Sequence, residues 1–499
     1  MCQYIRIKNK LIRKKAPQTS NFIVWLPVTK RGPKPRLKPL DADCCSGTIK
    51  CRSRGINNQS HFAPRFVPSR QFYLLIIFLL YSIIVFTGDS KMITLQDATK
   101  LLKDKNQEQI LRYYNELSDA EQQTFLQQIE NINWDDFAKI GKADAAQRGE
   151  FAPPPALSIE KIAENAATYE KTGLEAIKKG EVAAVLLAGG MGTRLGFDLP
   201  KGCFDVGQTR HLYIFECLIN NLLDVVKQAG VYVPLYIMTS EKNDQATRSF
   251  FKEHNYFGYD KDYVKFFIQD MACAVDYNGK LLLEEKGRLA TSPNGNGGWF
   301  TSMVKAELDK DLHARGVKWI NIFAVDNVLQ RIADPVFVGA TIEGKYQSAS
   351  KVVRKVEPHE KMGLLCLEDN KPSIVEYYEM SKEMAEARDA DGSLTYKFGV
   401  ILNYLFSLDK LEQIVNDSLE IHVVEKKIPY IDEKGEKISP TEPNGYKFEL
   451  LVLDMVHMMD NNLAFEVERE KEFAPIKNLH GTDSVDSARE LLKKNNIIL

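Results

Sequence analysis

Hydrophobic residues gather in short runs in the middle of the chain, with helical patterns between some of them. Four runs, VAAVLLAGG, VPLYIMTS, VKFFIQ and WINIFAVDN, occupy residues 182–190, 233–240, 264–269 and 319–327. A short apolar run bounded by glycine or polar residues is typical of a strand that is buried on both faces. Alternation of such strands with helices predicts an α/β fold, in which helices cover both faces of a mixed, mostly parallel central sheet.

The sequence before the first run is predicted to be helical from about residue 92 to 180. Ser118 and Glu121 have the spacing of a capping box at the start of an amphipathic stretch. A proline-rich segment, residues 151–158, reads as an extended linker before a second helix. After residue 428, turns alternate with short apolar runs, which predicts a smaller β-rich lobe.

Charge divides the chain into two unlike parts. Residues 1–91 contain 17 Lys and Arg but only 3 Asp and Glu, whereas residues 92–499 contain 49 and 64, a net charge of −15. We therefore expect a basic extension (1–91), a helical region (92–180), an α/β domain (181–427) and a C-terminal lobe (428–499). The acidic folded part, and an extension without a recognisable binding module, argue against a nucleic-acid partner.

The extension contains an uncharged apolar segment of 15 residues, FYLLIIFLLYSIIVF at 72–86. This length is at the lower limit for crossing a membrane. Two interpretations are open: the segment anchors the protein, or the extension is not part of the working protein and Met92 starts a cytoplasmic chain. The four cysteines beyond the extension lack paired spacing, which favours a reducing compartment.

The turn after the first apolar run carries the candidate chemistry. Its sequence, LAGGMGTRLGFDLPKG at 187–202, is rich in glycine. Glycines at the carboxyl end of a strand let the backbone approach a ligand, and the amides of such a turn bind anions. The pattern G-x-G-x-x-x-G is one residue longer than the dinucleotide fingerprint, and lysine follows proline rather than the glycine of a P-loop. Two fixed cations, Arg194 and Lys201, suit a triphosphate or pyrophosphate.

This turn resembles the signature of UTP-dependent sugar-nucleotide pyrophosphorylases, and most closely that of the UDP-N-acetylhexosamine pyrophosphorylases. The likeness runs from about residue 166 to 478 and includes PNGNGG, VDN, VEYYEMS, KKIPYIDEKG, PNGYKFE and EFAPIKN in this order. It implies a Rossmann-like nucleotidyltransferase fold and the formation of a UDP-sugar and pyrophosphate from UTP and a sugar 1-phosphate. It further implies a requirement for Mg²⁺ or Mn²⁺ and a monomer or homodimer.

The resemblance also implies roles for individual residues. Nucleotide contacts are expected from Leu187, Ala188, Gly189, Gly190, Lys201, Gln269, Gly295, Asp326 and Lys447. Contacts to the sugar phosphate are expected from Asn296, Glu376, Tyr377, Asn403 and Lys477. Arg194, Lys201 and Lys477 are expected to neutralise phosphate charge during the reaction. Asp326, at the end of an apolar strand, is the expected metal ligand, since Mg²⁺ prefers oxygen ligands.

The sequence departs from the family at one position in the sugar pocket. The family has an asparagine after a glycine where this chain has Val400 after Gly399. Asn403 would present a substitute amide on the same face if the segment were helical. N-acetylglucosamine 1-phosphate is the expected sugar, with N-acetylgalactosamine 1-phosphate and glucose 1-phosphate open. A second alternative is a regulator that binds nucleotide sugars without catalysis, against which the joint presence of the cations and Asp326 argues.

Overall fold

The computed structural model describes residues 93–139, 148–415 and 419–499, all within the compact unit Asp89–Leu499. The apolar segment 72–86, with the two interpretations attached to it, lies outside the described residues. In the described part of the chain, no helix is both long enough and apolar enough to cross a membrane.

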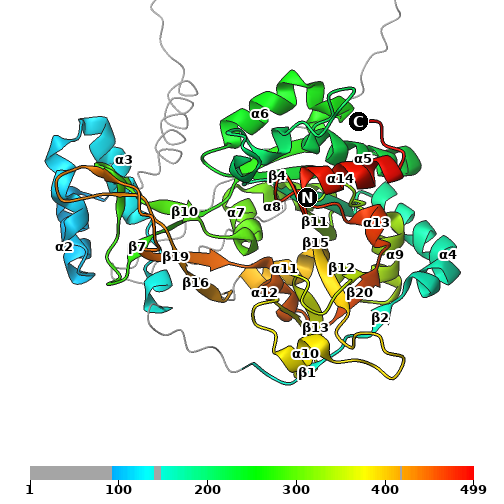
Figure 1. Cartoon of the computed structure of the whole chain (residues 1–499). Coiled ribbons are helices and arrows are strands. Elements are labelled where there is room, and N and C mark those ends of the chain that lie inside the picture. Colours follow the sequence, from blue (N-terminus) through cyan, green and yellow to red (C-terminus); the bar gives the residue numbers. More distant parts are fainter. Residues whose placement is uncertain (1–92, 140–147, 416–418) are drawn as a thin grey trace, which may run out of the picture. The chain divides into compact units, whose positions relative to one another are not determined.

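A mixed, mostly parallel sheet forms the centre of the fold (Figure 1). Its strands lie in the order β2 (Ala156–Leu157), β20 (Asn462–Glu466), β12 (Ser348–Arg354), β15 (Phe398–Ser407), β11 (Trp319–Ala324), β3 (Val182–Leu187), β4 (Leu235–Thr239) and β5 (Val264–Ile268). Only β15 on this path runs antiparallel to its neighbours. The predicted α/β fold is confirmed, since the four apolar runs are β3, β4, β5 and β11.

A short antiparallel extension adjoins this path. It consists of β1 (Phe151–Ala152), β13 (Leu364–Glu368) and β14 (Lys371–Val375). β1 pairs with β13, and β2 pairs with β20. The segment 151–158, predicted as a linker, is extended as expected, but both of its ends are incorporated into the sheet.

Helices cover both faces of the sheet because the strand residues alternate between them. In β3, Val182, Ala184 and Leu186 belong to one apolar cluster, and the three residues between them belong to a second cluster. The first cluster includes residues of α4 (Ile159–Lys178), α5 (Ile214–Ala229), α6 (Asp244–Glu253), α9 (Pro335–Glu343) and α14 (Val485–Lys494). The second includes residues of α7 (Trp299–Lys305), α8 (Leu308–Arg315), α11 (Leu408–Val415) and α12 (Val452–His457).

A smaller assembly has its own apolar cluster. It contains α2 (Leu95–Asp104), the 3₁₀ helix η1 (Glu108–Glu116), α3 (Asp119–Glu130) and a sheet in the order β16 (Ile421–Lys426), β19 (Gly445–Leu450) and β7 (Val275–Asp276). The capping box of Ser118 and Glu121 is present at the start of α3. Residues after 428 thus contribute to this assembly through β19 and to the central sheet through β20. The domain boundary at 427/428 stays a prediction.

Shorter elements connect these parts. They are β6 (Met271–Cys273) paired with β10 (Thr291–Pro293), β8 (Leu283–Glu285) with β9 (Arg288–Leu289), β17 (Tyr430–Ile431) with β18 (Lys437–Ile438), α10 (Lys382–Glu386), α13 (Arg469–Glu472), and 3₁₀ helices η2 (Trp134–Lys139), η3 (Thr193–Leu195), η4 (Lys201–Cys203), η5 (Asn255–Gly258), η6 (Lys261–Tyr263) and η7 (Asn296–Gly298).

Two glycines allow α4 and α9 to cross at close range. A Cβ added to Gly173 would lie 1.9 Å from the carbonyl oxygen of Pro335, and one added to Gly339 would lie 1.8 Å from that of Tyr169. Each glycine therefore contacts the backbone of the other helix directly. α9 follows Asp334, whose side chain accepts a hydrogen bond from the backbone N–H of Val336 and so caps the helix.

Replacing Gly339 with alanine should lower the free energy of unfolding by about 1–3 kcal/mol, the usual cost of forcing a methyl group into a packed interface. Urea unfolding followed by circular dichroism measures the change. Thr172→Ala at the same interface removes only an exposed hydrogen bond to Glu343 and should change stability by less than about 0.5 kcal/mol. Equal midpoints for Gly339→Ala and the wild type would contradict the close crossing.

Candidate active site

The glycine-rich turn begins where β3 ends and folds back on itself. Gly192 donates a backbone hydrogen bond to the carbonyl of Leu199 (2.9 Å), and Lys201 donates one to that of Gly190 (3.2 Å). Gly196 between them has φ +65°, a conformation that favours glycine. The closed loop brings Lys201 back to the start of the turn, with its side chain almost fully buried, while Arg194 is exposed.

A buried asparagine that the sequence analysis missed holds the first residues of this turn. The Asn243 amide donates to the carbonyls of Ala188 (2.9 Å) and Gly190 (3.2 Å), and its oxygen accepts from the backbone N–H of Ser240 (2.8 Å). Asn243 comes just after β4, the strand beside β3. Only the position of an asparagine at the carboxyl end of a predicted neighbouring strand could have indicated it.

Gln269 lies directly against the turn, as the resemblance implied for the residue that reads uracil. A Cβ added to Gly189 would lie 2.2 Å from Gln269 Nε2. The Gln269 side chain is buried, and its backbone N–H bonds to the carbonyl of Thr239 at the end of β4. Of the predicted contacts in the turn, Gly189 therefore lies directly against the Gln269 side chain.

Three cations and one carboxylate converge beside this turn. Lys201 Nζ lies 3.9 Å from Asp326 Oδ2, beyond the carboxyl end of β11. Burial lowers the pKa of Lys201, and Asp326 opposes that effect. Arg194 and Lys477 lower the pKa of Lys201 further, which requires both to be close to it. The structure thus brings together Arg194, Lys201, Asp326 and Lys477.

Lys477 reaches this group because its segment runs alongside the residues that follow β11. Ile476 donates a backbone hydrogen bond to the carbonyl of Asp326 (2.9 Å), and Asn327 forms a β-bridge with Pro475. Lys477 Nζ lies 3.0 Å from Asp483 Oδ2, so it is already partly neutralised. The neighbourhood of Asp326 and Lys477 is therefore fixed by backbone contacts rather than by their side chains alone.

The predicted loop PNGNGG packs against residues 450–452. Gly295 has φ +91°, and a Cβ on it would lie 2.2 Å from the carbonyl oxygen of Leu450. The Asn296 side-chain oxygen accepts from the backbone N–H of Val452 (3.0 Å), at the start of α12. Lys447, on β19, has a different set of charged neighbours: burial lowers its pKa, and so does Lys242. In the part of the chain that the structure describes, Lys447 forms no ion pair or hydrogen bond with Lys201.

Glu376, one of the expected sugar-binding residues, lies within the electrostatic reach of Lys477. Burial and Glu379 raise the pKa of Glu376, whereas Lys477 opposes this rise. Tyr377 beside it is exposed. A Cβ added to Gly363 would lie 3.3 Å from Val400 Cγ2 and 3.6 Å from Glu376 Oε1, so these two side chains flank one glycine.

The expectation for Asn403 is wrong. Residues 398–407 form the strand β15 rather than a helix, so Val400 and Asn403 point to opposite faces of the sheet. The Asn403 side chain is completely buried, where it accepts from Asn321 Nδ2 (2.8 Å) and donates to the carbonyl of Arg331 (3.1 Å). It supports the polypeptide behind the site and cannot bind the sugar.

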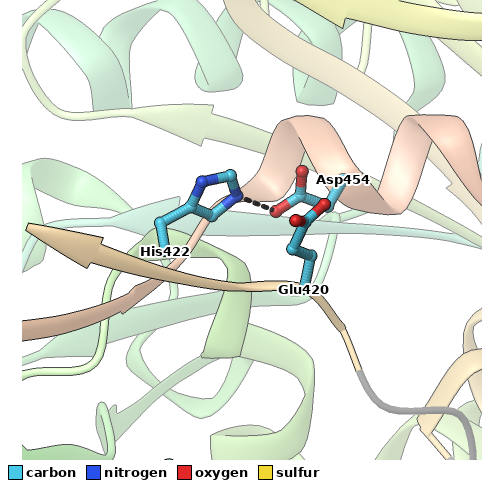
Figure 2. A group of neighbouring side chains, drawn as sticks. All are labelled: Glu420, His422 and Asp454. Carbon is cyan, nitrogen blue, oxygen red and sulfur yellow. Dashed lines mark hydrogen bonds and ion pairs between the residues drawn. The ribbon is translucent and has the colours of Figure 1, made fainter. Parts of the chain in front are cut away.

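Glu420, His422 and Asp454 form a cluster that the sequence analysis also missed (Figure 2). Their nearest side-chain oxygens and nitrogen lie within 4.8 Å of one another. His422 Nε2 bonds Asp454 Oδ2 at 2.9 Å, which raises the pKa of His422 and satisfies both partners without an ion. His422 is also one of the groups that lower the pKa of Glu376, so the cluster borders the sugar side.

A cavity of about 1470 Å³ adjoins the nucleotide side rather than the cation cluster. Gln269, Asn294 and Gly297 line one part of it, and residues of α3 and of the β8–β9 hairpin line another. Asn294 Oδ1 is buried there without a hydrogen-bond partner. The cations that surround Asp326 do not line this cavity, so it does not define the phosphate site.

Comparison with known proteins agrees with this arrangement. Residues 113–498 match the family of UTP–glucose-1-phosphate uridylyltransferases. The chain is 37% identical over 421 residues to UDP-N-acetylglucosamine pyrophosphorylase of Saccharomyces cerevisiae, covering 79% of this chain and 88% of that protein. It is 35% identical over 423 residues to human UDP-N-acetylhexosamine pyrophosphorylase-like protein 1, covering 80% and 83%.

Solved structures give the same assignment. The crystal structure of uridine diphosphate N-acetylglucosamine pyrophosphorylase from Trypanosoma brucei is 28% identical, with a TM-score of 0.69 over 80% of this chain and 85% of that one. A UDP-glucose pyrophosphorylase from Leishmania major shares the fold at 16% identity, with a TM-score of 0.52 over 72% and 77%. This chain belongs to the UTP–glucose-1-phosphate uridylyltransferase family and is a UDP-sugar pyrophosphorylase.

Proposed function

We propose that this enzyme forms UDP-N-acetylglucosamine and pyrophosphate from UTP and N-acetylglucosamine 1-phosphate. The observation that carries the chemistry is that Lys201 lies beside Asp326 at the carboxyl ends of β3 and β11, in the electrostatic field of Arg194 and Lys477. Asp326 and Asp483 offset only part of the charge of these three cations, and a triphosphate and a sugar phosphate would neutralise the rest.

In this proposal the nucleoside of UTP lies on the surface made by Leu187, Ala188, Gly189, Gly190 and Gln269, with Gly295 and Lys447 as further contacts. Asn296, Glu376, Tyr377 and Lys477 bind the sugar phosphate. Lys477 serves both sides because its charge acts on Lys201 and on Glu376 alike. The cation that meets the attacking phosphate therefore lies between the two substrates.

The proposed step is an in-line displacement. An oxygen of the sugar phosphate forms a bond to the α-phosphorus of UTP, and the bond from that phosphorus to the bridging oxygen of the β-phosphate breaks. Pyrophosphate leaves with the electron pair. The nucleophile is already an anion, so no general base is needed, and positioning and charge neutralisation by Arg194, Lys201 and Lys477 suffice.

The donor set at Asp326 fits a divalent cation. Mg²⁺ is usually held by one or two carboxylates together with substrate phosphates, and it keeps several waters. Asp326 is a partly exposed carboxylate at the edge of the proposed phosphate site, and its ion-pair partner is Lys201, 3.9 Å away. Bound there, Mg²⁺ or Mn²⁺ would withdraw negative charge from the phosphate oxygens.

The choice of sugar rests on the relatives and on the pocket. The yeast relative and the trypanosomal structure are both named as N-acetylglucosamine enzymes. Glucose 1-phosphate and N-acetylgalactosamine 1-phosphate are the alternative sugars, because Val400 replaces the family's sugar-contacting asparagine. We further propose a cytoplasmic location, since the four cysteines in the described residues are all free thiols.

Pyrophosphate release from UTP with each of the three sugar 1-phosphates tests the proposal. Fastest release with N-acetylglucosamine 1-phosphate supports it, and fastest release with either other sugar replaces the substrate. Release with none of the sugars, together with tight binding of UDP-N-acetylglucosamine, would favour the non-catalytic regulator.

Arg194→Ala should reduce kcat by on the order of 10², the cost of losing one preorganised charge contact in the transition state. Steady-state pyrophosphate release measures it. Arg112→Ala is the matched control, because Arg112 pairs with Glu433 on the smaller assembly and touches none of the proposed site residues. Near-normal turnover of Arg194→Ala would remove Arg194 from the mechanism.

Val400→Asn should raise the ratio of kcat/KM for N-acetylglucosamine 1-phosphate over glucose 1-phosphate by roughly tenfold, within the range of one pocket contact. The added amide would lie beside Glu376, where it can bond a substituent of the sugar. Competition between the two sugars in one assay gives the ratio directly. The same substitution at Val356, whose side chain is 73% exposed, should leave it unchanged. An unchanged ratio for Val400→Asn would remove this position from the sugar pocket.

Glu376→Gln should raise the melting temperature at pH 7.5 while weakening sugar binding. Burial, assisted by Glu379, raises the pKa of Glu376, so the folded state holds its proton more tightly than the unfolded state does. The carboxylate therefore destabilises the fold increasingly as pH rises through its raised pKa, and the gain from glutamine should vanish below about pH 4.5.

Glu383→Gln provides a control of opposite sign. Hydrogen bonds from its own backbone N–H and from Ser381 lower the pKa of Glu383. Its ionised form therefore stabilises the fold above its unfolded pKa, and glutamine should lower the melting temperature slightly at pH 7.5. Equal pH dependence of the two variants would contradict the assigned environment of Glu376.

A further inference from the structure

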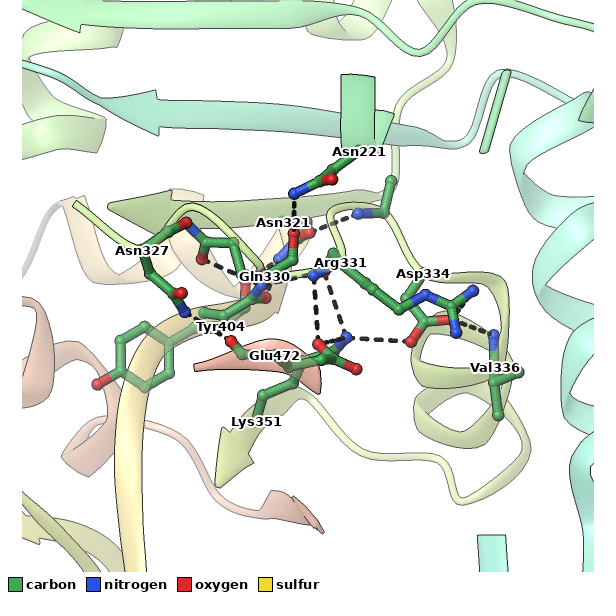
Figure 3. A network of polar contacts seen from close by, with 12 residues as sticks. Asn221, Asn321, Asn327, Gln330, Arg331, Asp334, Val336, Lys351, Tyr404 and Glu472 are labelled. Atoms are coloured by element: carbon green, nitrogen blue, oxygen red, sulfur yellow. Dashed lines mark hydrogen bonds and ion pairs between the residues drawn. The ribbon is translucent and has the colours of Figure 1, made fainter. Parts of the chain in front are cut away.

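The loop that follows β11, residues 326–334, packs against a network of buried polar side chains (Figure 3). Asn221 donates to the carbonyls of Val328 (3.1 Å) and Gln330 (3.0 Å). Gln330 donates to the carbonyls of Ala324 (2.6 Å) and Asn327 (2.9 Å). The loop that begins with Asp326 is thus fixed by side chains beneath it rather than by secondary structure of its own.

Lys351 lies at the centre of this network of polar side chains. It is in the middle of β12, and its side chain is completely buried. Its ammonium donates to Glu472 Oε2 (2.6 Å), to Asp334 Oδ2 (3.0 Å) and to the carbonyl of Arg331 (3.2 Å), which uses all three of its protons. A lysine with no exposure and three bonds has little freedom to move, so it is a rigid contact point on the central sheet.

The two carboxylates that Lys351 binds come from two different segments. Asp334 ends the loop that begins at Asp326. Glu472 ends α13, just before the segment that leads to Lys477. The same Glu472 carboxylate also accepts from the backbone N–H of Arg331 (3.2 Å). Lys351 therefore connects the Asp326 loop and the Lys477 segment to one strand of the sheet.

Asn327 provides the second connection between these segments. Its amide donates to the carbonyl of Glu472 (2.8 Å), and its side-chain oxygen accepts from the backbone N–H of Ala474 (2.9 Å). Both segments then continue directly to the site, since Ile476 bonds the carbonyl of Asp326. A displacement of Glu472 would therefore shift Lys477 relative to Asp326.

The buried carboxylates Asp334 and Glu472 are neutralised by the buried Lys351 and by Arg331, whose side chain is about half exposed. Lys351 and Arg331 face Asp334 and Glu472, and Arg331 Nη2 lies 3.9 Å from Asp334 Oδ1. Burial would raise the pKa of Asp334, but Lys351 and Arg331 outweigh it and lower that pKa. Buried ion pairs add little net stability compared with apolar side chains of similar size. Stability alone therefore does not explain a charged group at this place.

We propose that Lys351 is a positioning residue for uridylyl transfer, which sets the distance between Asp326 and Lys477 by binding Asp334 and Glu472 at once. This inference rests on the proposed function, in which Asp326 and Lys477 meet the phosphates. Lys351 touches neither substrate, because it is enclosed behind the loop.

A double-mutant cycle with Lys477→Ala tests it in the full-length protein. Lys351→Met should lower kcat by on the order of 10², the effect of a misplacement of about 1 Å in a reacting group. In the Lys477→Ala background, the same change should cost less than about threefold, because the residue that it positions is already absent. A purely structural role predicts equal factors in both backgrounds, and that result would overturn the proposal.

Binding of UTP gives a readout that is independent of turnover. Calorimetric titration should show that Lys351→Met weakens UTP binding by roughly tenfold in the wild-type background and by less than about threefold in Lys477→Ala, since contacting groups are coupled. If the wild type releases no pyrophosphate with any of the three sugar 1-phosphates, the proposed function fails. The double-mutant cycle measured by UTP binding still decides the role of Lys351. Additive effects on UTP binding, or no effect, would overturn the positioning role.

Two further variants separate positioning from loss of the fold. Lys351→Met combined with Glu472→Gln leaves Arg331 and Asp334 as a balanced pair, so it should fold even if the single variant does not, and should show the same non-additivity with Lys477→Ala. Arg354→Met, on the same strand, removes an ion pair with Glu466 on β20 and should leave kcat and UTP affinity unchanged. A loss of kcat in Arg354→Met equal to that in the Lys351 variants would show a general effect of disturbing β12, and would overturn the proposal.

Discussion

The structure of the site depends on one electrostatic constraint: three cations, Arg194, Lys201 and Lys477, must lie close together with only two carboxylates, Asp326 and Asp483, paired with them. Lys201 is almost completely buried beside Asp326, in the field of Arg194 and Lys477, and this environment lowers its pKa. Such a group is unfavourable until an anion arrives. The protein holds it by fixing each charge to rigid backbone: a closed glycine turn for Lys201 and a β-bridge beside Asp326 for the segment that leads to Lys477. Preorganisation of this kind is what phosphoryl-group transfer needs, because the chemistry itself requires little covalent help.

Holding these charges explains why so many polar side chains are buried behind the site. The backbone of the loop after β11 forms few hydrogen bonds within the loop, and the side chains of Asn221 and Asn403, together with the loop's own Gln330, satisfy its carbonyls. Buried polar networks cost much when they are incomplete and fix one arrangement when they are complete. The same logic applies at the other edge of the site, where Asn243 holds the glycine turn. The cation cluster is therefore supported from two sides by side-chain amides.

The sequence predicted the parts of this arrangement that leave a local pattern. Apolar runs identified β3, β4, β5 and β11, and the glycine turn identified Arg194 and Lys201, because burial on both faces and close backbone approach each restrict residue type. Asn403 was misjudged because the stretch around it, FGVILNYLF, is apolar at nearly every position and so does not distinguish a strand from a helix. Lys351 was missed because the sequence does not show which charged side chain of β12 is buried. In the structure, Lys351 is completely buried, whereas Arg354 is about half exposed. The burial of a side chain depends on tertiary packing, and neither the spacing of residues nor the composition reveals it.

The sugar pocket and the support of the cation cluster share β15, so they cannot vary independently. Val400 and Asn403 project from opposite faces of this strand, one beside Glu376 and the other against the loop that begins at Asp326. Between them Leu402 has φ +52°, unusual for a branched residue, and the register with β12 shifts between Ser350 and Val352. The residue of β12 at this irregularity is Lys351. A substitution that moves β15 to suit another sugar would therefore also displace the network of buried polar side chains around Lys351 that aligns Asp326 and Lys477 in the proposal. In the proposed mechanism, a change of sugar preference through the side chain of Val400 alone leaves this alignment intact, whereas a change through movement of the strand disturbs it.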